Sequence, residues 1–306
     1  MSAVDDRPAR SERPAPSDGP ARSNRPADRR TGGAVRVGRF GVAPSRVTAA
    51  IVLGVVGLVF AVPIVALVQF TFRQGTDGGL TFAHYAAIVD PVNASTYRPV
   101  FDGLGASLVI AVLTVAIVLL VLLPAQVITA LRYPRLRRVL EFVCILPITV
   151  PLVVLVVGFI PVYQVVARVF GSGSWTLAFA IGIVALPFAF RPIATAAAAM
   201  DMVVLTEAAR SLGASWWAVT WRVLLPGLRR GITAACFLTV TVVLGEYTLA
   251  SFLSRTTFQP GLVLVQQTDP YVAAIFSVAA LVFGFLLLVV IGRVGARRRR
   301  TPKESS

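Results

Sequence analysis

One carboxylate in this sequence lies where a charge is costly. Glu246 interrupts an apolar stretch, residues 231–254, that has no other charged side chain. An ionisable group inside a membrane-spanning segment is expensive and suggests a functional role. A carboxylate facing a water-filled path would favour a cationic solute or hold a gate, so Glu246 and its neighbour Tyr247 are candidates for a solute path. A structural pairing of Glu246 with a buried arginine or a backbone amide remains equally open.

Residues for other chemistry are scarce. His84 is the only histidine, and no cysteine lies near it in the sequence to complete a metal site, so we expect a solvated loop histidine and no metal or other cofactor. Lys303 is the only lysine and lies in the C-terminal tail. A nucleotide-binding P-loop needs a lysine after its glycine-rich turn. We therefore predict that the chain is not an enzyme, and that any ATP hydrolysis belongs to another polypeptide.

The composition indicates a membrane protein. Hydrophobic residues make up 56% of the chain and charged residues only 14%, against about 25% charged in an ordinary soluble domain. A helix of about 20 apolar residues crosses a bilayer. The sequence predicts an all-α, polytopic membrane protein with six transmembrane helices, at residues 47–72, 103–131, 142–167, 175–200, 231–254 and 270–292.

The basic residues set the expected topology. With six spans, all but four of the 29 Lys and Arg residues fall on one side; the exceptions are Arg73, Arg98, Arg168 and Arg255. Positive residues collect in cytoplasmic segments, so both termini are predicted to be cytoplasmic, with anionic lipid and no nucleic acid as the partner of the charge. Arg191, at the inner end of the fourth span, is expected to have a structural role, snorkelling to lipid phosphates or bracing the next loop. The excess of arginine over lysine suggests a GC-rich bacterial genome, and hence a bacterial cell membrane.

The remaining segments divide the chain into regions. Residues 1–46 are rich in Arg, Pro, Asp, Ser and Ala, so we expect a disordered basic cytoplasmic tail followed by a first transmembrane helix at 47–72. Residues 103–295 form the expected five-helix core, and residues 296–306 a second basic cytoplasmic tail.

The longest internal cytoplasmic segment, residues 201–230, is not built like a solvated loop. Thr206 is predicted to cap a short helix with Glu207 in its first turn, and Gly213 to end that helix with a positive φ. Ser215 can start the next helix, and Leu225-Pro226 marks entry into the fifth span. Three tryptophans in this segment suit the headgroup level of a membrane; they are Trp216, Trp217 and Trp221. These features predict a helix-turn-helix at the cytoplasmic face of the membrane.

The spacing of this segment resembles the cytoplasmic signature loop of permease subunits of binding-protein-dependent ABC importers, of the type I MetI-like family. The matching positions are Glu207, Ala208, Ala209, Gly213, Val223, Leu225 and Pro226. Val223 stands where the family more often has Ile. The resemblance extends more loosely over residues 103–295.

The resemblance implies a role for each of these positions. In this family the loop contains a coupling helix that sits in a cleft of a cytoplasmic ATPase and transmits its closure to the membrane helices. Glu207 would then be the polar contact to the ATPase, Ala208 and Ala209 the close-packing face, and Gly213 the bend. The implied partners are ABC ATPase subunits, an extracellular or periplasmic solute-binding protein, and a second permease subunit as homodimer or heterodimer. Two permease subunits would form one alternating-access path.

The solute is less well defined. Leu244-Gly245-Glu246-Tyr247 and Ser251-Phe252-Leu253 resemble the branch that handles polyamines, ferric iron, thiamine and oxyanions. Glu246 favours a polyamine such as spermidine or putrescine over the others in that branch. Two rivals are a stand-alone secondary transporter, for which we see no inverted repeat, and a membrane enzyme, for which the acidic residues are too few.

Overall fold

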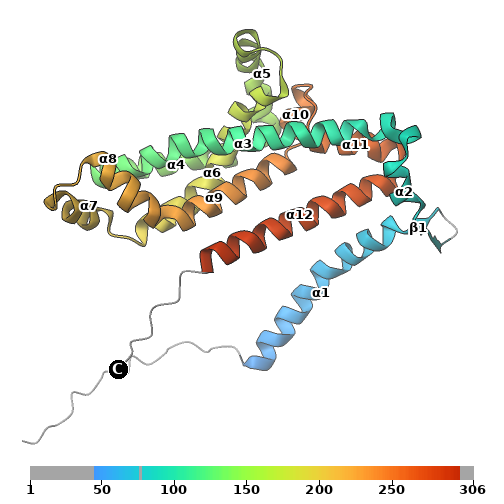
Figure 1. Cartoon of the computed structure of the whole chain (residues 1–306), viewed down its shortest axis with the longest axis horizontal. Helices are drawn as coiled ribbons and strands as arrows, with labels where there is room; N and C mark the ends of the chain where they lie inside the picture. Colours follow the sequence, from blue (N-terminus) through green and yellow to red (C-terminus); the bar gives the residue numbers. More distant parts are fainter. Residues whose placement is uncertain (1–44, 76–77, 297–306) are drawn as a thin grey trace, which may run out of the picture. The chain divides into compact units, whose positions relative to one another are not determined.

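The computed structural model describes residues 45–75 and 78–296, and its long elements are all helices (Figure 1). By internal contacts the chain divides into one unit of residues 1–53 and a second of residues 54–306, with the boundary inside α1. The predicted tails, 1–46 and 296–306, lie almost wholly outside the described residues. The elements are α1 (Arg46–Thr71), β1 (Arg73–Gln74), β2 (Gly79–Leu80), α2 (Ala83–Val89), η1 (Pro91–Asn93), α3 (Ala94–Leu131), η2 (Pro134–Leu136), α4 (Arg137–Thr149), α5 (Leu152–Phe170), η3 (Ser174–Thr176), α6 (Leu177–Ala198), α7 (Met202–Ser211), α8 (Trp216–Val219), η4 (Thr220–Leu224), α9 (Leu225–Gly245), α10 (Thr248–Phe252), α11 (Phe258–Thr268) and α12 (Pro270–Ala296).

Six helices of the described part are long and apolar enough to cross a membrane. They are α1, α3 with η1, α5, α6 with η3, the continuous helix Trp216–Gly245 and α12. The predicted all-α, polytopic class with six spans is therefore confirmed. The one sheet in this part is a two-stranded antiparallel ribbon in which Arg73 pairs with Leu80.

The third span is shorter than predicted. Residues 142–167 were expected to form one helix, but α4 ends at Thr149 and α5 begins at Leu152. Val150 is extended, with φ −92° and ψ 130°, as the residue before a proline tends to be, and Pro151 has no N–H to donate to a preceding turn. Only α5 is therefore long enough to span, and α4 is a separate helix that packs mainly against α6.

The fifth span also differs from its prediction. Instead of covering residues 231–254, the helix runs without interruption from Trp216 to Gly245 and stops before Glu246. Glu246 leaves the helix with φ −82° and ψ 112°, and its side chain accepts a hydrogen bond from the N–H of Leu249 in the first turn of the short helix α10 that follows. The carboxylate therefore lies at the end of the span and not within it.

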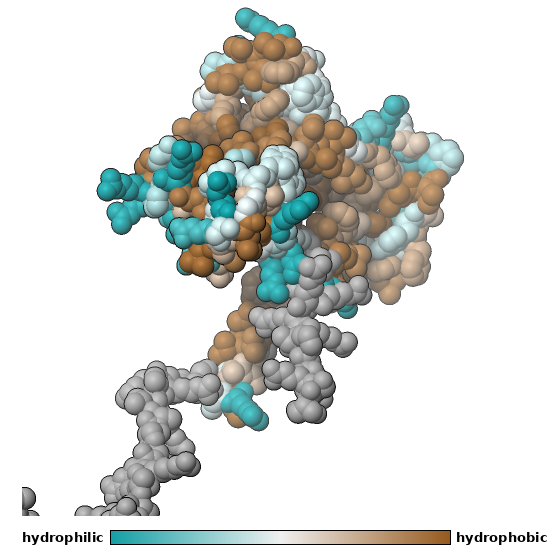
Figure 2. Space-filling view, turned by 60° about the vertical axis from the view of Figure 1, so that its left-hand side comes forward, coloured by the Kyte–Doolittle hydropathy of each residue, from teal (hydrophilic) through white to brown (hydrophobic). Residues whose placement is uncertain are grey.

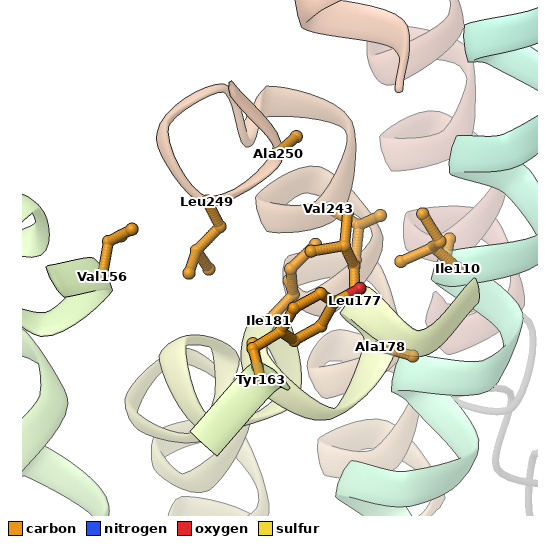
Figure 3. Packing of buried hydrophobic residues seen from close by; sticks show 11 residues of the cluster. Ile110, Val156, Tyr163, Leu177, Ala178, Ile181, Val243, Leu249 and Ala250 are labelled. Carbon is orange, nitrogen blue, oxygen red and sulfur yellow. The ribbon is translucent and has the colours of Figure 1, made fainter. Parts of the chain in front are cut away.

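The core of the second unit is built on α3, α6 and α9, which contact one another along their lengths (Figure 1). Figure 3 shows one buried cluster of this core, in which Ile110 of α3, Ile181 of α6 and Val243 of α9 converge. Tyr163 of α5 joins the same cluster, and its hydroxyl is hydrogen-bonded to Thr176 at the start of α6. The cluster fixes the C-terminal part of α9 against α5 and α6.

Helix α11, which the sequence analysis did not predict, packs closely on the first turns of α3. Two glycines permit the approach: a Cβ on Gly103 would collide with the carbonyl oxygen of Thr257, and one on Gly261 with that of Pro99. Ser107 Oγ accepts a hydrogen bond of 2.9 Å from the backbone N–H of Phe258 at the start of α11. The contact between α3 and α11 therefore rests on close packing of the two backbones and on a buried side-chain hydrogen bond.

The surface of the described chain is largely apolar. Figure 2 shows hydrophobic side chains over most of the drawn face, with hydrophilic ones gathered where segments project. The span windows of α1 and α5 are hardly buried at all, which suits helices that face lipid or another subunit.

His84 is not the solvated loop residue that we expected. It lies on α2, half-buried, with Nε2 3.1 Å from the carbonyl oxygen of Arg73, and its ring stacks on Tyr271 at 4.4 Å between centroids. The Tyr271 ring shields one face of the imidazole from water.

Candidate functional site: the α7–α8 corner and Glu246

Helix α7 begins earlier than the sequence indicated. Asp201 is the N-cap: its Oδ1 accepts a hydrogen bond of 3.1 Å from the N–H of Val204. The prediction that Thr206 caps this helix is wrong, because Thr206 lies in the second turn and its side chain is buried. Glu207 follows it in the same turn and is exposed.

Helix α7 has an inner and an outer face. Met202, Thr206 and Ala209 face inward, where Met202 and Ala209 pack into a cluster with Val219, Leu224 and Leu228. Val204, Ala208 and Leu212 recur at intervals of four residues and are all exposed, Leu212 to 88%. The expectation that Ala208 and Ala209 share one outward face is therefore corrected, since Ala209 packs against the chain itself.

Leu212 is the residue that sequence reasoning missed. A leucine side chain that is exposed so completely at a helix end has no packing role within the described chain. The signal was present in the sequence, because Leu212 continues the i, i+4 spacing from Val204 through Ala208. The outer face of α7 thus combines an apolar stripe with the carboxylate of Glu207.

The turn after α7 is a Schellman motif. Gly213 has φ +86°, its N–H donates to the carbonyl oxygen of Arg210 at 2.9 Å, and the N–H of Ala214 donates to that of Ala209 at 3.1 Å. The predicted positive φ at Gly213 is confirmed. Ala209 and Ala214 both pack on the same buried cluster, which completes the motif's usual apolar contact.

The second helix starts as predicted and then continues into the fifth span. Ser215 Oγ accepts a hydrogen bond of 3.2 Å from the N–H of Ala218, and the guanidinium carbon of Arg210 lies 5.1 Å from the ring centroid of Trp216. Helix η4 (Thr220–Leu224) is a π-helical turn that joins α8 to α9.

The motif residues of η4 and α9 have mixed exposure. Val223 and Leu225 are half-buried and Pro226 is exposed, whereas Leu224 between them is fully buried. The corner therefore continues directly into the N-terminal end of α9, and the buried Leu224 fixes this junction against Met202 and Leu228.

Glu246 lies at the opposite end of α9. Its side chain is only 6% exposed, and Oε1 accepts a hydrogen bond of 2.7 Å from the N–H of Leu249. The sequence left open a pairing of Glu246 with a buried arginine or with a backbone amide, and the structure shows the pairing with a backbone amide. Its neighbour Tyr247 is exposed.

Arg191 joins two helices at the surface. One of its guanidinium nitrogens lies 3.8 Å from Glu141 Oε1, so the side chain links α6 to α4, and both partners are substantially exposed. An exposed pair at this distance contributes little to stability. No group of three or more His, Cys, Asp or Glu side chains arranged to hold a metal occurs within residues 45–75 and 78–296.

Six spans, a core of three long helices and a short two-faced helix before the fifth span define a helical, polytopic membrane protein. The chain belongs to the family of binding-protein-dependent transport system inner membrane components, whose sequence model matches residues 123–300. The match includes the whole α7–α8 corner and Glu246. The family comprises permease subunits of ABC transporters, and its branches are not separated by this match.

The chain is also similar to a curated relative. It is 26% identical over 265 residues to the probable ABC transporter permease protein y4fN of Sinorhizobium fredii (strain NBRC 101917 / NGR234). The aligned region covers 81% of this chain and 45% of that protein, so the chain spans a little under half the length of the relative.

Proposed function

We propose that this chain is the permease subunit of an ABC importer and that the outer face of α7 is its contact with a separate ATPase. The supporting observation is the two-faced α7, in which Glu207, Ala208 and Leu212 are exposed while Met202 and Ala209 attach the helix to the membrane core. A protruding helix that is rigidly joined to a span can transmit a push from a soluble partner to the bundle.

Contact with an ATPase is tested by site-specific photocrosslinking. A photoreactive residue replacing Ala208 or Leu212 in the full chain, expressed in its native host, should capture a polypeptide with a P-loop motif. Val92 is the matched control, because it is also exposed but lies in η1, far along α3 from the corner. Leu212→Asp should lower copurification of that ATPase by about tenfold or more, as for a central interface residue. Capture of the ATPase from position 92 alone would contradict the proposal.

The proposed setting is a bacterial cell membrane, with both termini and the α7–α8 corner in the cytoplasm. The ground for this orientation is the asymmetric distribution of Arg and Lys, of which only Arg73, Arg98, Arg168 and Arg255 fall on the other side. We infer that a second permease subunit, identical or different, and an external solute-binding protein complete the transporter.

The proposed mechanism is alternating access between inward- and outward-facing states. The chain breaks that would let the bundle bend are the extended Val150–Pro151 link between α4 and α5 and the extended Glu246 at the end of α9. ATP-driven closure on α7 would move α9 directly, because η4 joins the corner to α9 without a loop.

We propose a small polar solute, with a polyamine ahead of ferric iron, thiamine or an oxyanion. The preference for a polyamine rests on the negative charge of Glu246. Because the same carboxylate accepts a hydrogen bond from the first turn of α10, its charge and its hydrogen bond must be tested separately. Tyr247, exposed beside it, is the second candidate on the path. Uptake by proteoliposomes that hold the chain without any ATPase would instead favour a stand-alone secondary transporter.

A further inference from the structure

An apolar groove of about 770 Å³ lies between the second half of α3 and the α8–η4–α9 helix. One wall comes from α3 and includes Leu123 and Ile128; the other comes from Trp216, Trp217 and Trp221. The described residues place no other helix of the chain in this groove. The groove is separate from the outer face of α7 and from Glu246, so an occupant of it goes beyond the function proposed above.

The charge at the groove is positive and comes from arginine side chains. Arg132, the C-cap of α3, is the one charged residue among those that line it, and it is exposed. A second guanidinium, that of Arg210, does not line the groove, but its carbon lies 5.1 Å from the centroid of the Trp216 ring, which does. One cation therefore lines the apolar groove and a second lies against one of its tryptophans, whereas no carboxylate lines it.

The tryptophan wall comes from α8, which carries Trp216 and Trp217, and from the π-helical turn η4 (Thr220–Leu224), which carries Trp221. Wide turns of this kind occur often at functional sites. Trp217 and Trp221 lie 5.2 Å apart between centroids, with their rings inclined at 53°, and both are exposed. Indole has an apolar body and an N–H donor, a combination that suits the boundary between acyl chains and headgroups.

We propose that this groove binds one anionic phospholipid, with an acyl chain along the apolar walls and the phosphate at the end marked by Arg132. The lining extends along α3 from Ala116 to Arg132. At 1.5 Å per residue that is about 24 Å of helix, more than the roughly 15 Å of hydrocarbon in one leaflet. The positive end and the uncharged channel together match a ligand with one anionic head and a long apolar tail. The lipid would support the wall from which the α7–α8 corner projects.

Quenching of tryptophan fluorescence tests the proposal, because three of the chain's four tryptophans line the groove. In a Trp175→Phe background, the full chain is reconstituted in phosphatidylcholine with increasing fractions of brominated phosphatidylglycerol or brominated phosphatidylcholine. We expect half-maximal quenching at a several-fold lower fraction of the anionic lipid. Arg132→Gln should raise that fraction about fivefold, the effect of about one basic residue at an anionic surface. Arg132→Lys should retain most of the preference.

Two matched variants separate the site from bulk lipid. Arg135→Gln removes an exposed arginine of η2 that does not line the groove, and should leave the preference unchanged. Ile128→Phe fills the groove and should weaken quenching by both lipids. The proposal would be overturned if the two lipids quenched equally and Arg132→Gln left this quenching unchanged. Tryptophans shielded from both lipids would also overturn it, because the groove would then be covered by a second copy of the chain or another subunit.

Discussion

The Glu246 carboxylate accepts a hydrogen bond of 2.7 Å from the N–H of Leu249, and this contact ties the end of α9 to the first turn of α10. A buried cap and a solute-binding charge are different uses of one side chain. Glu246→Gln keeps a side-chain oxygen that can accept from Leu249 but removes the charge, whereas Glu246→Ala removes both.

We therefore expect the two variants to differ. Glu246→Ala should lower the thermal midpoint of the purified protein, because a buried N–H is left without an acceptor at a cost of about 1–3 kcal/mol. Glu246→Gln should unfold close to the wild-type temperature. If the carboxylate also attracts a cationic solute, Glu246→Gln should still lose uptake. Normal uptake by Glu246→Gln would remove Glu246 from the solute path and leave it a structural role.

The approach of α11 to α3 yields a prediction with an internal control. Gly103→Ala should destabilise the protein by about 1–3 kcal/mol, because the new methyl group meets the backbone carbonyl of Thr257, which cannot move aside easily. Gly105→Ala, two residues further along α3, adds the same methyl group in open space and should be neutral or slightly stabilising. Thermal unfolding in detergent compares the two. Equal effects would show that α11 does not pack there.

The Schellman turn should be sensitive to the residue at position 213. Gly213→Ala places a Cβ at φ +86°, where no neighbouring atom obstructs it, so the cost is backbone strain of about 1–2 kcal/mol. Limited proteolysis after Arg210 should become faster, because the turn that protects this bond opens more often. Gly158→Ala on α5, also in open space but with no positive φ, is the control and should be cut at the wild-type rate.

The orientation of the corner can be measured directly. Ser211 and Ser215 are both exposed and flank the turn, so a cysteine at either position should react with a membrane-permeant maleimide and not with an impermeant one in intact cells. For this measurement Cys144 and Cys236 are first replaced with alanine or serine. A cysteine at Val92, at the other end of α3, should react with both the permeant and the impermeant maleimide. Labelling of position 211 or 215 from outside would contradict the cytoplasmic corner and, with it, the ATPase contact.

Several features of the site were predicted from local chemistry and are confirmed. Gly213 ends a helix with a positive φ and Ser215 starts the next one, because each depends on the backbone within a few residues. The start of α7 was not predicted correctly. Asp201 and Thr206 are both acceptable caps in isolation, and only the burial of Met202 and Thr206 against the core decides for Asp201.

The sequence alone determined the membrane class and the number of spans, because long uncharged apolar segments are unstable when exposed to water. This inference does not depend on which other helices each segment contacts. It also placed the α7–α8 corner through its glycine, serine and proline. The tertiary structure decided which faces look outward. Ala209 turns inward and Leu212 outward, Glu246 meets a backbone amide, and Gly103 and Gly261 admit α11. Each of these features depends on contacts between elements that are distant in the chain, or on which face of a helix packs against the core. Neither can be read from local sequence spacing alone.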